Sequence, residues 1–328
     1  MKKIKLSKRS NKLIGQGMFQ IKAKATGKDL LHFEIGDSCF NSPKKVKKAC
    51  IKAIKKNKTH YTDPLGLPEL RKAIADKYGE FVNVENVAII PANFGIFASM
   101  SILCDKEIDY PVPGFPTYKA VASYLGLKRN KKAKIHILNY PNNPTGEIKS
   151  FNTPEFVIYD AAYSDMLYGA KCKTFLGNDK SIFLGSFSKS HAMSGYRLGY
   201  MIGPKEIIEK VGLLIETTYS CLPEFIQYSG IEALKIDGYK MKELKERRNL
   251  MHTALADHYT FEDPKGGIYF WCKGGDRDFL DGDKEFNRLL KQGIVCCPGS
   301  VFGKKDYIRF CFAKPTEEIK KLGEILDG

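Results

Sequence analysis

The chain has 328 residues, 43% of them hydrophobic, which is enough for one large or two medium domains with a substantial core. No run of about 18 apolar residues occurs, which excludes a membrane-spanning helix. The basic N-terminus leads into no apolar segment, so we expect no secretory signal. Nine cysteines without regular spacing predict a cytoplasmic protein rather than a disulfide framework.

The net charge of +16 is the unusual feature of the composition. Many lysines fall in residues 43–56, where apolar residues recur with helical spacing and the lysines take the opposite face. This pattern predicts an amphipathic helix with a solvated basic face. Because no aromatic residues are interleaved with these lysines, nucleic acid is an unlikely partner, and attraction of an anionic substrate is the alternative.

Short β-rich segments alternate with helical ones along the first 240 or so residues. Strands are predicted at 86–90, 133–138, 155–159 and 181–184, and helices at 68–78, 95–103, 205–214 and throughout the region 222–256. This alternation is typical of an α/β protein with a mostly parallel sheet. From residue 240 a charged helix leads into short strands and helices, which predicts a smaller α+β domain.

Polar side chains follow the predicted strands where each strand ends. Asn143 comes after strand 133–138, Asp160 ends strand 155–159, and Lys189 follows strand 181–184. Open α/β sheets bind ligands at this edge. Cys296 and Cys297 are too close together to be a pair of tetrahedral zinc ligands and have no His/Cys cluster beside them, so we predict no metal site.

Lys189 and its neighbours predict pyridoxal 5'-phosphate (PLP) as a cofactor. A lysine amine can form a Schiff base with this phosphorylated aldehyde, while Ser186 and Arg197 grip its phosphate. Asp160 can keep the pyridine nitrogen protonated. Four further contacts are expected: hydrogen bonds to the ring oxygen from Asn143 and Tyr163, an aromatic cover from Phe115, and backbone amides for the phosphate from the helix start near Gly95 and Ile96.

Residues 186–199 resemble the PLP-attachment pattern of the class I/II aminotransferases, the fold-type I family that includes aspartate aminotransferase. Other matches follow in the family's order and extend from about residue 30 to the end of the chain. They are Phe33–Asp37, Tyr61 with Gly66–Arg71, Pro113–Phe115, Asn143–Gly146, Asp160 with Tyr163, Pro298–Gly303 and Tyr307–Arg309.

The resemblance implies a fold-type I PLP-dependent transferase with two domains. Residues 36–239 would form the large PLP-binding domain with its mostly parallel sheet, and residues 1–35 and 240–328 the small α+β domain. The gaps from Tyr118 to Asn139 and from Asn143 to Asp160 are shorter than usual in the family. We therefore expect a trimmed large domain.

The resemblance also implies roles for individual residues. Lys189 would hold the cofactor and move the substrate proton, with the phosphate bound by Ser186, Arg197 and the amides of Gly95 and Ile96. Tyr61 would reach that phosphate from the neighbouring subunit, which implies a homodimer. Arg309 would bind the substrate α-carboxylate as a two-pronged fork, and the remaining expected substrate contacts are Gly36 and Asn143.

We therefore predict an aminotransferase that moves an amino group between an amino acid and a 2-oxo acid, or another carbonyl compound, by a ping-pong mechanism. Residues 213–220 contain no arginine for a second carboxylate, which argues against aspartate or glutamate as the preferred donor. The alternatives are a PLP-dependent decarboxylase or lyase and, in another class, a non-catalytic PLP-binding or nucleic-acid-associated protein. The motifs serve the cofactor, so they identify neither donor nor acceptor.

Overall fold

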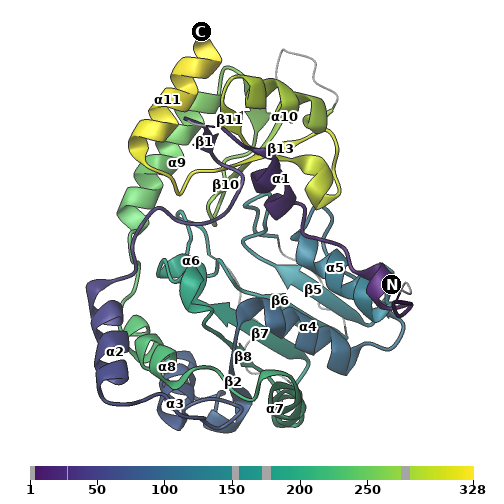
Figure 1. The fold of residues 1–328 in the computed structure, drawn as a ribbon, viewed down its shortest axis with the longest axis vertical. Helices are drawn as coiled ribbons and strands as arrows, with labels where there is room; N and C mark the ends of the chain where they lie inside the picture. The colour runs from purple at the N-terminus through teal and green to yellow at the C-terminus, as the bar shows by residue number, and fades with distance from the viewer. Residues whose placement is uncertain (1–3, 28, 150–154, 172–178, 275–280) are drawn as a thin grey trace.

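Five strands form the main sheet of the lower half of the molecule, in the order β2–β8–β7–β6–β5 (Figure 1). The computed structural model describes residues 4–27, 29–149, 155–171, 179–274 and 281–328. Neighbouring strands are parallel from β5 to β7, whereas β8 runs antiparallel to both β7 and β2. The sheet is therefore mixed, and every strand except β8 ends at the same edge. The strands are β2 (Val87–Ile90), β5 (Ile135–Asn139), β6 (Phe156–Asp160), β7 (Ser181–Ser186) and β8 (Gly199–Ile202).

Helices cover both faces of this sheet. Alternate strand residues point to opposite faces, so Val87 and Ile89 join one hydrophobic cluster, and Ala88 and Ile90 join another. The first cluster includes residues of α2 (Lys44–Lys55), α3 (Pro68–Tyr78) and α8 (Glu224–Ala233). The second includes residues of α4 (Ala92–Leu103), α5 (Pro116–Leu125) and α7 (Lys205–Tyr219). Burial on both sides explains why these strands are almost continuously apolar.

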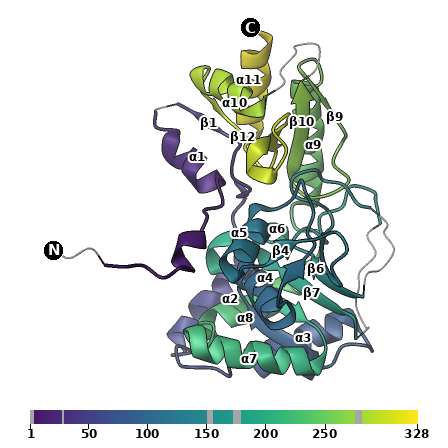
Figure 2. The ribbon, with the colours of Figure 1, turned by 90° about the vertical axis from the view of Figure 1, so that its right-hand side faces the viewer.

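The upper half contains an antiparallel sheet in the order β12–β13–β10–β9 and the helices α9, α10 and α11 (Figures 1 and 2). The N-terminal segment joins this half, because β1 pairs with β11 and Met18 of α1 belongs to the same hydrophobic cluster as Leu244 and Leu326. This packing supports the predicted division at residues 35/36 and 239/240, which stays a prediction. The bounds are α1 (Met18–Lys24), β1 (Leu31–His32), α9 (Met241–Leu255), β9 (Tyr259–Phe261), β10 (Tyr269–Gly274), α10 (Gly282–Lys291), β11 (Ile294–Val295), β12 (Cys297–Pro298), β13 (Ile308–Cys311) and α11 (Thr316–Asp327).

The region 222–256 is helical over most of its length, as expected, and its second helix is close to the charged helix expected from residue 240. The region contains two helices, α8 and α9, because Gly238 and Lys240 adopt left-handed backbone angles, with φ of 59° and 61°, between them. No helix in the described ranges is long and apolar enough to cross a membrane. The remaining short elements are η1 (Ser10–Lys12), η2 (Val84–Asn86), β3 (Glu107–Ile108), β4 (Lys128–Arg129), α6 (Phe187–Ser190), η3 (Ser194–Tyr196) and η4 (Gly299–Phe302).

Candidate active site

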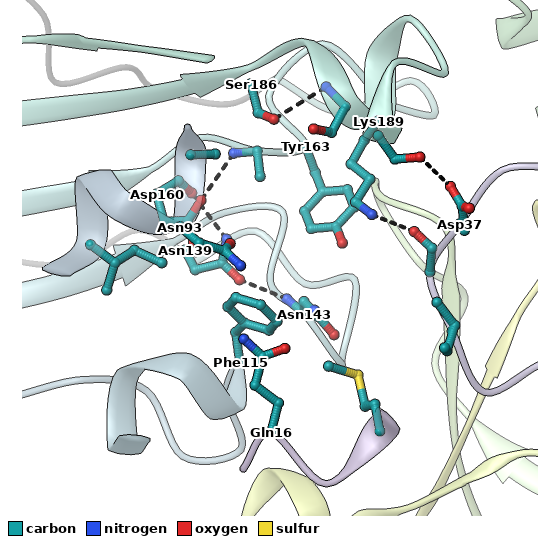
Figure 3. Close-up of a pocket in the computed structure, with 18 of the residues that line it drawn as sticks. Gln16, Asp37, Asn93, Phe115, Asn139, Asn143, Asp160, Tyr163, Ser186 and Lys189 are labelled. Atoms are coloured by element: carbon teal, nitrogen blue, oxygen red, sulfur yellow. Dashed lines mark hydrogen bonds between the residues drawn. The ribbon is translucent and has the colours of Figure 1, made fainter. Parts of the chain in front are cut away.

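A cavity of about 490 Å³ lies where the main sheet ends, with the N-terminal segment forming part of its wall (Figure 3). Asn139, Asp160 and Ser186, the last residues of three neighbouring strands, all line it. Most of the residues singled out in the sequence meet here. Those that line the cavity are Gly36, Ile96, Phe115, Asn143, Asp160, Tyr163, Ser186, Lys189 and Arg197.

Lys189 projects into the cavity from α6, the short helix that follows β7. Ser186 begins this helix, and its Oγ accepts a hydrogen bond of 3.2 Å from the Ser188 amide. The Lys189 amine donates to the carbonyl oxygen of Gly36. Burial lowers the pKa of Lys189, and the nearby Cys311 and Asp37 oppose this effect. The neutral, nucleophilic amine therefore forms more readily here than in water.

Asp160 lies at the end of β6 with its carboxylate held on both oxygens. Oδ2 accepts a 2.6 Å hydrogen bond from the Tyr118 hydroxyl, and Oδ1 accepts one of 3.2 Å from the Ala162 amide. Burial raises the pKa of Asp160, while these two hydrogen bonds lower it. Tyr118 had no predicted role. The contact joins residues 42 positions apart, and no sequence pattern relates them.

Asn139 joins the ends of β5 and β6. Its side-chain amide donates to the Asp160 carbonyl at 3.0 Å, and its Oδ1 accepts from the Asn143 amide at 2.8 Å. It thereby fixes the start of the loop that carries Asn143. Sequence reasoning gave Asn139 no role, although its position at a strand end, in register with Asp160, was an available signal.

Tyr163 and Tyr269 form a hydroxyl pair at the cavity wall, with their oxygens 2.9 Å apart. Burial raises the pKa of Tyr269 to about 12, so both groups stay protonated near neutral pH. A side chain at Gly36 would collide with this pair, because its Cβ would lie 1.7 Å from the Tyr269 oxygen. Sequence analysis did not identify Tyr269.

Arg309 is fully buried behind the cavity wall rather than exposed in it. One terminal nitrogen donates to Asn143 Oδ1 at 2.9 Å, and the other contacts the Glu34 carbonyl and lies 3.4 Å from the Met18 sulfur. The Tyr269 ring packs against the guanidinium at 4.0 Å. The predicted contact with a substrate carboxylate stays a prediction.

The Gly95 amide is not free for the predicted phosphate contact, whereas the contact predicted for the Ile96 amide stays a prediction, and Ile96 lines the cavity. Helix α4 begins at Ala92, three residues earlier than expected, and the Gly95 amide donates to Pro91 O at 3.2 Å within its first turn. The first amides of a helix have no intrahelical acceptor. In α4 these include the amides of Ala92 and Asn93, and both residues line the cavity.

Two of the other predicted phosphate ligands, Arg197 and Tyr61, differ in position. Arg197 lines the cavity, and one guanidinium nitrogen donates to Ser194 O at 2.6 Å, which leaves its other donors for a ligand. Tyr61 is 87% exposed and does not line the cavity. Its predicted contact needs a second subunit and stays a prediction.

The cavity offers the groups that PLP requires. Lys189 supplies an amine of lowered pKa, Asp160 a buried carboxylate, and Phe115 an aromatic side chain at the wall. Ala92 and Asn93 add amides at a helix start, where phosphate binds well. The Ser186 hydroxyl accepts one hydrogen bond and can still donate another. The donor set thus fits the aldehyde, the ring nitrogen and the phosphate.

Tyr269→Phe tests whether the hydroxyl pair positions Tyr163. The ring, and with it the packing on Arg309, is retained, so we expect the loss of one hydrogen bond to lower kcat/KM by about 10-fold. Tyr168→Phe is the matched control, since that hydroxyl donates to Gly267 O at 2.8 Å away from the cavity. Steady-state kinetics would contradict the role if both variants behaved alike.

Comparison with known proteins gives the same family across the chain. The profile of the family described as aminotransferase class I and II matches residues 28–131 and 126–326. The (5-formylfuran-3-yl)methyl phosphate transaminase of Methanocaldococcus jannaschii is 32% identical over 92% of this chain and 91% of its own length. The aspartate aminotransferase of Thermotoga maritima is 28% identical over 93% of both chains.

Solved structures agree with this assignment. The structure of the Thermotoga maritima aspartate aminotransferase matches with a TM-score of 0.90 at 26% identity, covering 98% of this chain and 99% of that one. A Methanococcus jannaschii protein, described as similar in its active site to kynurenine aminotransferases, matches with a TM-score of 0.91 at 30% identity over the same shares. The matched sequence and the shared fold span nearly the whole chain, which therefore belongs to the class I and II aminotransferases, a PLP-dependent family of fold type I.

Proposed function

We propose that this aminotransferase moves an amino group between an amino acid and a small carbonyl compound in the cytoplasm, as a homodimer with shared active sites. One observation carries the proposal: the lysine of lowered pKa, the buried carboxylate and the helix-start amides all face a single cavity. Each of these groups has a separate task in PLP chemistry. Their convergence is the reason to assign the roles below.

The chain's own residues bind and orient the reactants. PLP, when bound, withdraws electrons from the amino acid and carries the amino group from donor to acceptor. Asp160 would hold the ring nitrogen, Tyr163 and Asn143 the ring oxygen, and Ser186, Arg197, Ala92 and Asn93 the phosphate. Lys189 Nζ would take the proton from the substrate α-carbon, since burial favours its neutral form. Arg309 would hold the α-carboxylate once the Met18 sulfur moves off its terminal nitrogen.

Decarboxylation or elimination on the same scaffold is the alternative, and one incubation separates them. With an amino acid and no carbonyl acceptor, we expect one equivalent of oxo acid per active site and then a stop, because the amino group has nowhere to go. A decarboxylase would instead release carbon dioxide through many turnovers. Continuous turnover without an acceptor would overturn the proposal.

The relatives' names suggest two kinds of substrate. One acts on a phosphorylated furan aldehyde, and the others act on aspartate. Residues 213–220 supply no arginine for a second carboxylate. We therefore propose testing phosphorylated aldehydes as acceptors alongside the common 2-oxo acids.

Mixed dimers test the shared active site. We expect Tyr61→Ala and Lys189→Ala to be impaired alone, and to recover activity when unfolded and refolded together. In a mixed dimer one of the two sites would combine an intact Lys189 from one subunit with an intact Tyr61 from the other. Random pairing of equal amounts makes half of the dimers mixed, so about a quarter of the wild-type number of sites would be restored. Light scattering would establish the dimer independently. No recovery in proven mixed dimers would contradict the role of Tyr61.

A further inference from the structure

Part of the cavity wall has no task in binding PLP. Gln16, Met18, Phe19 and Lys22 line it from the N-terminal segment. Met18, Phe19 and Lys22 fall on one side of α1, because residues four positions apart in a helix lie above one another. This helix face therefore looks into the cavity.

The face of α1 that carries Met18 and Lys22 starts next to Arg309, the proposed site for the substrate α-carboxylate. The Met18 sulfur lies 3.4 Å from a terminal nitrogen of Arg309, and Lys22 follows about one helical turn further along α1. A substrate held by its α-carboxylate at Arg309 would thus extend its side chain along α1. Besides Met18, the apolar side chains of Phe19 and Ile35 also line the cavity.

Hydrogen bonds to helix α5 hold the N-terminal segment, which precedes and includes α1, in place. Gln16 Nε2 donates to Thr117 Oγ1 at 2.7 Å, and Ser123 Oγ donates to the Lys12 carbonyl at 2.9 Å. Both partners belong to α5, which is packed on the main sheet. The helix that carries Lys22 is therefore anchored beside the cavity.

Lys22 is a cation without an assigned partner. It is exposed on α1, and no acidic side chain in the described part of the chain forms an ion pair with it. The carboxylates that line the cavity are otherwise engaged, Asp37 with the Ser194 hydroxyl at 2.6 Å and Asp160 with Tyr118. The other cations of the wall, Lys189 and Arg197, serve the cofactor in the proposed function.

We propose that Lys22 binds a second anionic group, a phosphate or a carboxylate, at the far end of the substrate side chain. The proposal rests on the proposed function and narrows its substrate to an amine or carbonyl compound with an apolar middle and an anionic end. The lysine comes from the same chain as the cavity. Lys22 would therefore take the role of the arginine that residues 213–220 lack.

The test compares Lys22→Gln with Lys24→Gln, a control on the same helix that is also exposed but does not line this cavity. Two matched donor pairs differ in the terminal charge and keep the α-carboxylate that Arg309 would hold: aspartate against asparagine, and O-phosphotyrosine against tyrosine. We expect Lys22→Gln to lower the charged-to-neutral ratio of kcat/KM by about 10-fold in at least one pair, and Lys24→Gln to leave it unchanged. Added salt should weaken the wild-type preference and affect the variant less.

Each result has a separate meaning. A fall in the carboxylate pair alone or in the phosphate pair alone identifies the anion and supports the proposal. Unchanged ratios, or equal falls in both variants, would overturn it. If the wild type binds PLP but transfers no amino group from any donor, the proposed function fails instead, and this outcome is visible before any variant is made.

Discussion

Lys189→Ala is expected to lower kcat by about four orders of magnitude, because the variant loses both the amine that bonds to PLP and the base that moves the substrate proton. Borohydride reduction of the wild-type holoenzyme should fix the cofactor on the peptide that contains Lys189, and mass spectrometry of the digest would show it. Lys205→Ala is a suitable control, since that side chain forms a surface ion pair with Glu85.

Lys189 should also make the free energy of unfolding of the apoprotein depend on pH. Its pKa is lowered from 10.5 in the folded chain, so the unfolded chain binds more protons between the lowered value and 10.5. The free energy of unfolding therefore rises with pH in that window. We expect Lys189→Met to be more stable than wild type at neutral pH, with the difference shrinking as the pH approaches 10.5. A constant difference would contradict the lowered pKa, whatever the activity of either protein.

The parts of the site at strand ends could be predicted from sequence. Asp160, Ser186 and Lys189 follow apolar strands directly, and strands that run the same way bring their ends to one edge of the sheet. This reasoning needs only local patterns and a general rule of α/β folds.

The supporting residues could not be predicted in this way. Tyr118 meets Asp160 from a helix, and Tyr269 meets Tyr163 from the other half of the molecule. Met18 reaches Arg309 across nearly the whole sequence. These contacts depend on how distant segments pack, and no spacing within one segment reveals them.

The start of α4 shows a different kind of error. The amides for the phosphate were expected at a helix start near Gly95 and Ile96, but the helix begins directly after Pro91. Gly95 instead allows close packing, since its Cβ would lie 2.7 Å from Ile90 Cδ1. The proline was the better signal, because proline marks helix starts and two other helices of this sheet begin at Pro68 and Pro116.

Asp160→Asn is expected to lower kcat by at least about 100-fold, because an amide cannot supply the negative charge that keeps the ring nitrogen protonated. Burial raises the pKa of Asp160 above 3.8 in the apoprotein, so this residue favours folding at low pH and loses that contribution as the pH rises through its folded pKa. The asparagine variant should lack this dependence. Thermal unfolding of both apoproteins across acidic pH would measure the difference.

Tyr118→Phe should give a smaller, graded effect through the same carboxylate. The Tyr118 hydrogen bond lowers the pKa of Asp160, so its removal should raise that pKa and move the acidic limb of the pH–rate profile to higher pH. We expect a loss of about 10-fold in kcat/KM on the acidic side. Tyr78→Phe is the control, since its hydroxyl pairs with Tyr200 away from the cavity. If the profile of Tyr118→Phe falls uniformly at every pH, the hydroxyl acts on packing rather than on the ionisation of Asp160.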